Sequence, residues 1–90
     1  MTDDKRTYID RYDWAQTKPT TAVVTSVATA TSRHPEQLPV LYEFIDPDAL
    51  NTLFTSGHGD SRLEVTFSFD GGRVTLRGDG TLTVVHGTET

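Results

Sequence analysis

The last third of the chain alternates between apolar and polar residues in three short runs, and this alternation limits the folds available to it. Residues 63–69, 73–77 and 81–85 place Leu, Val or Phe at every second position, with Thr, Ser, Glu or Arg between them. A period of two is typical of half-buried β-strands. An Asp-Gly pair at 70–71 and a Gly-Asp-Gly segment at 78–80 separate the runs, and short glycine-containing segments favour hairpins. We therefore predict an antiparallel meander.

The lengths of the two loops also predict the register of the meander. A two-residue turn at 70–71 places Phe67 opposite Val74, and a three-residue loop after Arg77 places Leu76 opposite Leu82. In this register the apolar side chains share one face, whereas a slip by one residue would turn half of them to solvent. We expect helices to cover that apolar face.

Two segments before the meander show the spacing of amphipathic helices. In the first, about residues 20–32, Val23 and Val27 belong to one apolar side. Its many β-branched residues are indifferent helix formers, so we expect this helix to depend on tertiary packing. In the second, about residues 35–45, the helical spacing is interrupted by Pro39, which predicts irregular turns.

A further helix is predicted over about residues 47–55. Asp46 precedes Pro47, so the Asp46 carboxylate can accept hydrogen bonds from free backbone N–H groups while the proline occupies the first helical position. Asp46 and Asp48 could also be read as an acid/base pair or as metal ligands. Nothing nearby supplies a base or a third ligand, so we favour capping and helix-dipole stabilisation.

The beginning of the chain has aromatic residues at alternate positions. Tyr8, Tyr12 and Trp14 follow a period of two, with Asp10 at the position between the tyrosines. This pattern predicts a short strand over about residues 8–14, although Asp10 counts against it. The aromatic side chains either pack over the core or project toward a partner.

These elements predict one α+β domain over residues 1–90, built of two layers. A three-stranded antiparallel meander, with the N-terminal strand as an optional fourth, is covered on one face by two to three helices. We expect frayed ends at 1–6 and 87–90. The predicted strands of the meander are about 62–69, 72–78 and 81–86.

The composition favours a soluble, cytoplasmic protein. The chain contains no cysteine, which suits a reducing compartment, and its polar start and short apolar runs predict neither a signal peptide nor a membrane span. The net charge is −5, lysine occurs only at Lys5 and Lys18, and Asp and Thr are abundant. Such a surface fits a protein that works at high salt, and it equally fits an ordinary acidic domain.

The sequence predicts no catalytic, cofactor-binding or metal-ligating residues. His34, His58 and His86 share no metal-ligand spacing, and we interpret them as a local cap, a loop residue and a strand residue. No serine lies in a nucleophile motif, and the short Gly-His-Gly segment is not followed by a helix that could hold a phosphate. We therefore expect no enzymatic activity.

Two longer segments carry a family resemblance. The sequence HPEQLPVLYEFIDPDALNTLF and the ending F-x-F-x-G-x-x-V-T-L-R-G-D-G resemble the halobacterial output domain family, type 1, with similarity over about residues 12–84. The family usually has an acidic residue where His34 stands. The resemblance implies a haloarchaeal signalling output found alone or joined to receiver and sensor domains, and it brings no established catalytic residues.

We therefore predict a regulatory module that acts through contact with another protein. The expected surfaces are the strand edges at 62–69 and 81–86 and the N-terminal aromatic segment, and edge pairing would also permit a homodimer. The residues assigned to these surfaces are Tyr8, Tyr12, Arg73, Arg77 and Thr83.

The alternative is a nucleic-acid-binding output that uses Arg62, Arg73 and Arg77 on the sheet face and loops. The predicted register weakens this alternative because it places Arg77 opposite Glu64, where a cross-strand ion pair of about 0.2–1 kcal/mol would neutralise the guanidinium. The acidic composition also argues against a site for anions.

Overall fold

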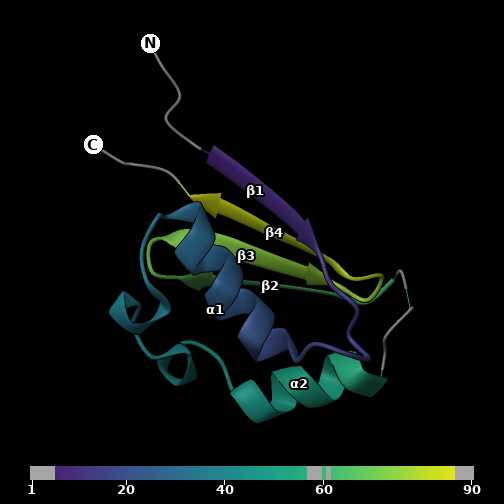
Figure 1. The fold of residues 1–90 in the computed structure, drawn as a ribbon. Coiled ribbons are helices and arrows are strands. Elements are labelled where there is room, and N and C mark those ends of the chain that lie inside the picture. Colours follow the sequence, from purple (N-terminus) through teal and green to yellow (C-terminus); the bar gives the residue numbers. More distant parts are fainter. Residues whose placement is uncertain (1–5, 57–59, 61, 87–90) are drawn as a thin grey trace.

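A computed structural model describes residues 6–56, 60 and 62–86 of the chain. The described residues form a four-stranded antiparallel sheet and two α-helices, and Figure 1 shows both helices on the same face of the sheet. In chain order the elements are β1 (Arg6–Arg11), α1 (Pro19–Ala30), the 3-10 turns η1 (Pro35–Gln37) and η2 (Leu41–Glu43), α2 (Pro47–Ser56), β2 (Glu64–Phe69), β3 (Gly72–Arg77) and β4 (Thr81–His86). The two-layer α+β prediction is confirmed, and the optional N-terminal strand belongs to the sheet.

The strands lie in the order β1-β4-β3-β2, and each neighbouring pair is antiparallel. The predicted register of the meander is confirmed, with Phe67 opposite Val74 and Leu76 opposite Leu82. β1 pairs with β4, so β4 lies inside the sheet. The prediction that 81–86 forms an exposed edge is therefore wrong, because the hydrogen bonds of that strand are used on both sides.

Thr83 illustrates this correction. It lies opposite Ile9 on one side and opposite Thr75 on the other. A proline at this position would remove a backbone donor from the interior of the sheet, so it would damage the fold rather than block an edge selectively.

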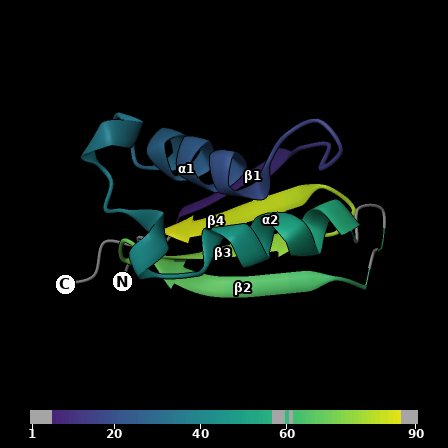
Figure 2. The same cartoon turned by 90° about the horizontal axis from the view of Figure 1, so that it is seen from below.

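The core lies between the sheet and the two helices. Figure 2, viewed from below, separates the helices: α1 lies toward the β1 and β4 side, and α2 lies toward the β3 and β2 side. The Thr20 backbone N–H donates to Asn51 Oδ1 at 3.1 Å and joins the two helices. The buried residues of the core cluster are Trp14, Ala22, Val23, Val27, Leu41, Leu50, Phe54, Phe69, Val74, Leu76, Leu82 and Val84.

The start of α2 follows the predicted capping pattern. Asp46 Oδ1 accepts from the backbone N–H of Asp48 at 3.0 Å and of Ala49 at 3.2 Å, and Pro47 is the first helical residue. These bonds satisfy donors that have no partner inside the helix. The carboxylate of Asp46 is thus engaged in capping.

Several element boundaries differ from the predicted ones. β1 covers Arg6–Arg11 rather than 8–14, because the Asp13 carboxylate accepts from the Ala15 N–H at 2.9 Å and turns the chain. Arg6 therefore lies in a strand, while the other residues of the predicted frayed ends lie outside the described part of the chain. The predicted irregular stretch at 35–45 consists of the two short 3-10 turns.

Gly80 provides a test of the contact between the segment that follows β1 and the loop before β4. Its φ is +104°, and a Cβ there would overlap the carbonyl oxygen of Tyr12, whereas Gly71, with φ +80°, has open space around it. We expect Gly71→Ala to cost about 1–2 kcal/mol of unfolding free energy from backbone strain alone. Gly80→Ala should cost roughly 3 kcal/mol or more, because overlap adds to strain. Chemical denaturation at constant salt measures both, and equal costs would contradict this account.

Candidate functional site

The sheet face that the helices leave uncovered is mostly polar. Alternation along the strands places on this open face Thr7, Ile9, Arg11, Glu64, Thr66, Ser68, Arg73, Thr75, Arg77, Thr81, Thr83 and Val85. Three arginines stand against one glutamate in this set, so the open face is positive although the chain carries −5. The Thr66 and Thr75 hydroxyls share a hydrogen bond of 3.0 Å across two strands.

Two of the arginines occupy the positions that the register predicted. Arg77 Nη2 lies 3.2 Å from Glu64 Oε2, with about half of each side chain exposed (51% and 49%), and Arg73 lies opposite Ser68. An exposed pair of this kind contributes at most about 1 kcal/mol. Arg62, the third arginine of the nucleic-acid alternative, pairs with Asp60 at 3.3 Å in the loop before β2.

The five residues assigned to an interaction surface fall on two different faces. Arg73, Arg77 and Thr83 share the open face, whereas Tyr8 and Tyr12 point to the helix-covered face and pack against the core. The Tyr12 hydroxyl is 2.7 Å from Ser26 Oγ of α1, which is fully buried. The structure therefore does not bring the tyrosines together with the arginines.

Tyr8 and Asp10 form a small polar contact at the outer side of β1. The Tyr8 hydroxyl donates to Asp10 Oδ2 at 3.1 Å, and partial burial together with the adjacent Asp10 carboxylate raises the pKa of Tyr8. Asp10 Oδ1 also accepts from the backbone N–H of Arg11 at 2.8 Å. The Asp10 side chain thus lies on the helix-covered face, and its carboxylate accepts a hydrogen bond from a backbone N–H of its own strand.

β1 and β2 form the two outer edges of the described sheet. On β1 the Asp10 carboxylate occupies an edge N–H group, whereas β2 has no side chain in that role among the described residues. The turn after β2 has positive φ at Asp70 (55°) and Gly71 (80°), as in a type I′ hairpin, which joins Phe69 and Gly72 by paired hydrogen bonds. At the other end, the Leu63 carbonyl accepts from the Gly78 N–H at 2.8 Å. The backbone N–H and C=O groups of the odd-numbered residues of β2 therefore point toward β3.

Among the described residues, the backbone groups of the even-numbered positions of β2 have no strand partner. In an antiparallel pair, hydrogen-bonded positions alternate along each strand. The N–H and C=O groups of Glu64, Thr66 and Ser68 consequently point away from β3. This row of unpaired groups can accept another strand.

Two half-exposed apolar side chains lie beside this free edge. Phe44 packs edge-to-face on Phe69, with 5.0 Å between ring centroids, and is 43% exposed. Leu53 of α2 is also 43% exposed. Asn51 faces α1, and a residue two positions further along a helix is turned by about 200°. Leu53 therefore lies on the side of α2 that faces away from α1.

We use the name β2 edge surface for the strand Glu64–Phe69 with Phe44 and Leu53. Sequence reasoning identified the strand edge but missed the two apolar side chains. Phe44 belongs to the segment predicted over about 35–45 and Leu53 to the helix predicted over about 47–55, and apolar spacing does not distinguish a buried residue from a half-exposed one. Only the packing of Phe44 on Phe69 and the orientation of α2 separate them from the core.

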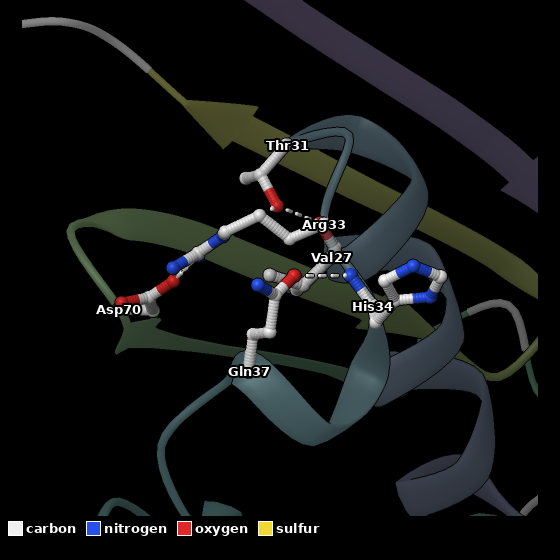
Figure 3. Close-up of polar contacts among 6 residues, drawn as sticks. All are labelled: Val27, Thr31, Arg33, His34, Gln37 and Asp70. Carbon is white, nitrogen blue, oxygen red and sulfur yellow. Dashed lines mark hydrogen bonds and ion pairs between the residues drawn. The ribbon is translucent and has the colours of Figure 1, made fainter.

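An ion pair fixes the turn that follows β2. Figure 3 shows Arg33 reaching from the segment after α1 to Asp70 in the β2–β3 turn, where the two side chains form a salt bridge. Arg33 Nε also donates to Thr31 Oγ1 at 3.2 Å, and the Thr31 hydroxyl donates to the Val27 carbonyl at 2.8 Å. The C-terminal end of β2 is therefore tied to the end of α1.

The neighbouring 3-10 turn is closed by a second contact in the same view. The backbone N–H of His34 donates to Gln37 Oε1 at 2.8 Å (Figure 3). The Gln37 backbone N–H donates to the His34 carbonyl at 2.9 Å. His34 stands at the beginning of η1 as expected, and the amide of Gln37 supplies the closing bond. His58 lies outside the described residues.

The described residues offer neither a metal-ion cluster nor a helix suited to a membrane. No group of three His, Asp or Glu side chains is arranged to hold a metal ion in the part of the chain that the structure describes. Within that same part, neither helix has the length and apolar character needed to cross a membrane.

The chain matches the model of a known protein family. The family model described as Halobacterial output domain 1 matches residues 15–86, which include both helices and three of the four described strands. Neither the curated proteins nor the solved structures that were searched gave a match.

The Arg33–Asp70 pair is testable by a double-mutant cycle. The two side chains are 35% and 21% exposed, so Arg33→Met should lower the unfolding free energy by roughly 1–3 kcal/mol by leaving a half-buried carboxylate unpaired. Adding Asp70→Asn should restore part of the loss, because asparagine tolerates the positive φ and needs no cation. Additive losses in urea denaturation would show that the pair contributes no coupling.

Proposed function

Because the chain belongs to the halobacterial output domain 1 family, we propose that it is a cytoplasmic regulatory module that acts through protein–protein contact and catalyses no reaction. The observation that supports this proposal best is the β2 edge surface. It combines free backbone groups at three positions with the half-exposed side chains of Phe44 and Leu53. Strand addition beside apolar contacts is a common mode of protein recognition.

The charge of the chain favours this surface over the arginine face. A net charge of −5 with few lysines suits a protein that works in concentrated salt. At molar salt the Debye length falls to about 3 Å, so exposed charges attract a partner weakly. Apolar burial and main-chain hydrogen bonds persist under these conditions, and salts that are excluded from protein surfaces strengthen apolar burial. The β2 edge surface offers both kinds of contact.

Nucleic-acid binding remains the second candidate because the structure adds a third arginine to the open face. Arg11 of β1 projects from the same face as Arg73 and Arg77. An open sheet face with spaced arginines and hydroxyls can contact phosphates. The Arg77–Glu64 pair and the screening of phosphate contacts at high salt count against this candidate.

Leu53 provides the test of protein contact. The tagged chain, expressed in a haloarchaeal host and purified in molar KCl, should retain a partner that is identified by mass spectrometry and then titrated as a purified protein. Leu53→Gln should weaken that binding by roughly tenfold, since burial of a leucine contributes about 1.5–3 kcal/mol. Thr25→Gln on the exposed side of α1 is the matched control and should bind normally. Equal binding by all three proteins would refute the assignment of the surface.

The nucleic-acid candidate predicts a different pattern. If the open face binds DNA, Arg77→Ala should weaken binding and lower the slope of log K against log salt by about one. We expect no such binding, and expect Arg77→Ala to cost less than about 1 kcal/mol of unfolding free energy by loss of the Glu64 pair. Fluorescence anisotropy with labelled duplex DNA, measured from low to molar salt, distinguishes the two results.

A further inference from the structure

The free edge of β2 is complementary to itself. The strand reads Glu-Val-Thr-Phe-Ser-Phe, with a single charged residue at one end and Thr66 near its middle. We propose that two copies of the protein form a two-fold symmetric dimer in which the β2 strands pair antiparallel, with Thr66 opposite Thr66. This inference rests on the proposed function and names a second copy of the chain as the occupant of the β2 edge surface.

The free backbone groups restrict the register of such a pair. Two residues exchange both hydrogen bonds only when each has its N–H and C=O directed at the other strand. In β2 these residues are Glu64, Thr66 and Ser68. With Thr66 on the symmetry axis, Glu64 lies opposite Ser68 of the second copy and Ser68 lies opposite Glu64. All three residues of each strand then find a partner.

The neighbouring registers are less favourable. A shift of the pairing toward the turn places Glu64 opposite Asp70, which brings two carboxylates together and competes with the Arg33–Asp70 pair. A shift in the other direction places Ser68 opposite Arg62, which lies outside the strand. The central register therefore gives full pairing without opposing like charges.

The side chains on the helix-covered face also match in this register. Val65 lies opposite Phe67 at positions without hydrogen bonds, where Cα atoms approach to about 4.5 Å and side chains pack closely. Both residues are only partly buried in the single chain. Leu53 of each α2 faces the other copy above this seam, so its 43% exposed side chain gains an apolar neighbour. The dimer thus covers the apolar part of the β2 edge surface.

The opposite edge of the sheet is protected against the same pairing. On β1 the Asp10 carboxylate already accepts the free N–H of Arg11, and it places a charge on the helix-covered side of the edge. Charges directed inward at an edge strand are a known device against strand addition. Pairing through β2 alone gives a closed two-fold dimer, whereas pairing through both edges would give an open chain of subunits.

Salt dependence separates this interface from one built on ion pairs. Each copy carries −5, and Glu64 is the one charged residue of the paired strand. The register also places Arg62 opposite Asp70 beyond the strand ends, but each of these side chains already has an ion-pair partner in its own chain, Asp60 and Arg33. Added KCl screens the repulsion between the two negatively charged copies, which opposes their association at low salt. Sedimentation equilibrium should therefore show tighter dimers in molar KCl than in dilute buffer. Tighter dimers in dilute buffer would overturn the proposal.

Single cysteines test the register directly, because the chain has none of its own. Thr66→Cys should form an intermolecular disulfide under mild oxidation, since Cα atoms across a hydrogen-bonded pair lie about 5.5 Å apart. Ser68→Cys is the matched control on the same strand and face. Its two copies would lie about 14 Å apart, from four residues at about 3.4 Å each, which is too far for a disulfide. Equal cross-linking of both variants, or none of Thr66→Cys, would refute the register.

Proline variants test the pairing without a cross-link. The Thr66 N–H points away from β3, so Thr66→Pro removes no backbone hydrogen bond of the sheet, only the exposed hydroxyl contact with Thr75, and should yield a folded monomer. Ile9→Pro makes the corresponding change at the free edge of β1 and should remain dimeric. Circular dichroism and thermal unfolding confirm that each variant folds. A wild-type monomer at all salt concentrations, or a dimeric Thr66→Pro, contradicts the dimer.

The experiments distinguish failure of the dimer from failure of the proposed function. If the wild type is monomeric and Leu53→Gln still loses a heterologous partner, protein contact stands and the second copy is the wrong occupant. If Thr66→Cys cross-links but no variant changes binding of any other protein, the dimer stands and the wider proposal of an output through protein contact fails.

Discussion

The indole of Trp14 holds together parts of the fold that lie far apart in the sequence. Its Nε1–H donates to the Arg77 carbonyl at 2.6 Å, its ring packs edge-to-face on Phe54 of α2, and Tyr12 stacks on it with 5.8 Å between ring centroids. The indole thus joins the end of β3, the second helix and the segment after β1 at one buried point. A tryptophan in such a position contributes both apolar burial and a satisfied donor. β1 is thereby held beside β4, which leaves β2 as the unprotected edge.

The meander and the helix cap could be predicted because their determinants are local. The lengths of the loops at 70–71 and 78–80 set the pairing of Phe67 with Val74 and of Leu76 with Leu82, and both pairings are found. The Asp46 cap needs only the residues that follow it. In each case the competing arrangement would expose apolar side chains or leave backbone donors unpaired within a few residues.

The surface was harder to predict because it depends on contacts between distant segments. The pairing of β1 with β4 removes an edge that a three-stranded meander would expose. No sequence pattern within residues 81–86 indicates this pairing. The exposure of Phe44 and Leu53 depends on how η2 and α2 lie against β2. The open face was predicted correctly for Arg73 and Arg77, and the structure adds Arg11 from the N-terminal strand.

The pairing of β1 with β4 has a consequence for how the protein forms. Arg11 and Thr81 are partners although they are 70 positions apart, whereas β2, β3 and β4 are joined by short turns. Closing a long loop carries a larger entropic cost than closing a hairpin, and non-local contacts slow folding. During synthesis the aromatic N-terminal strand therefore leaves the ribosome long before its neighbour exists. Until β4 is complete, that nascent segment has to remain unpaired or be shielded by chaperones.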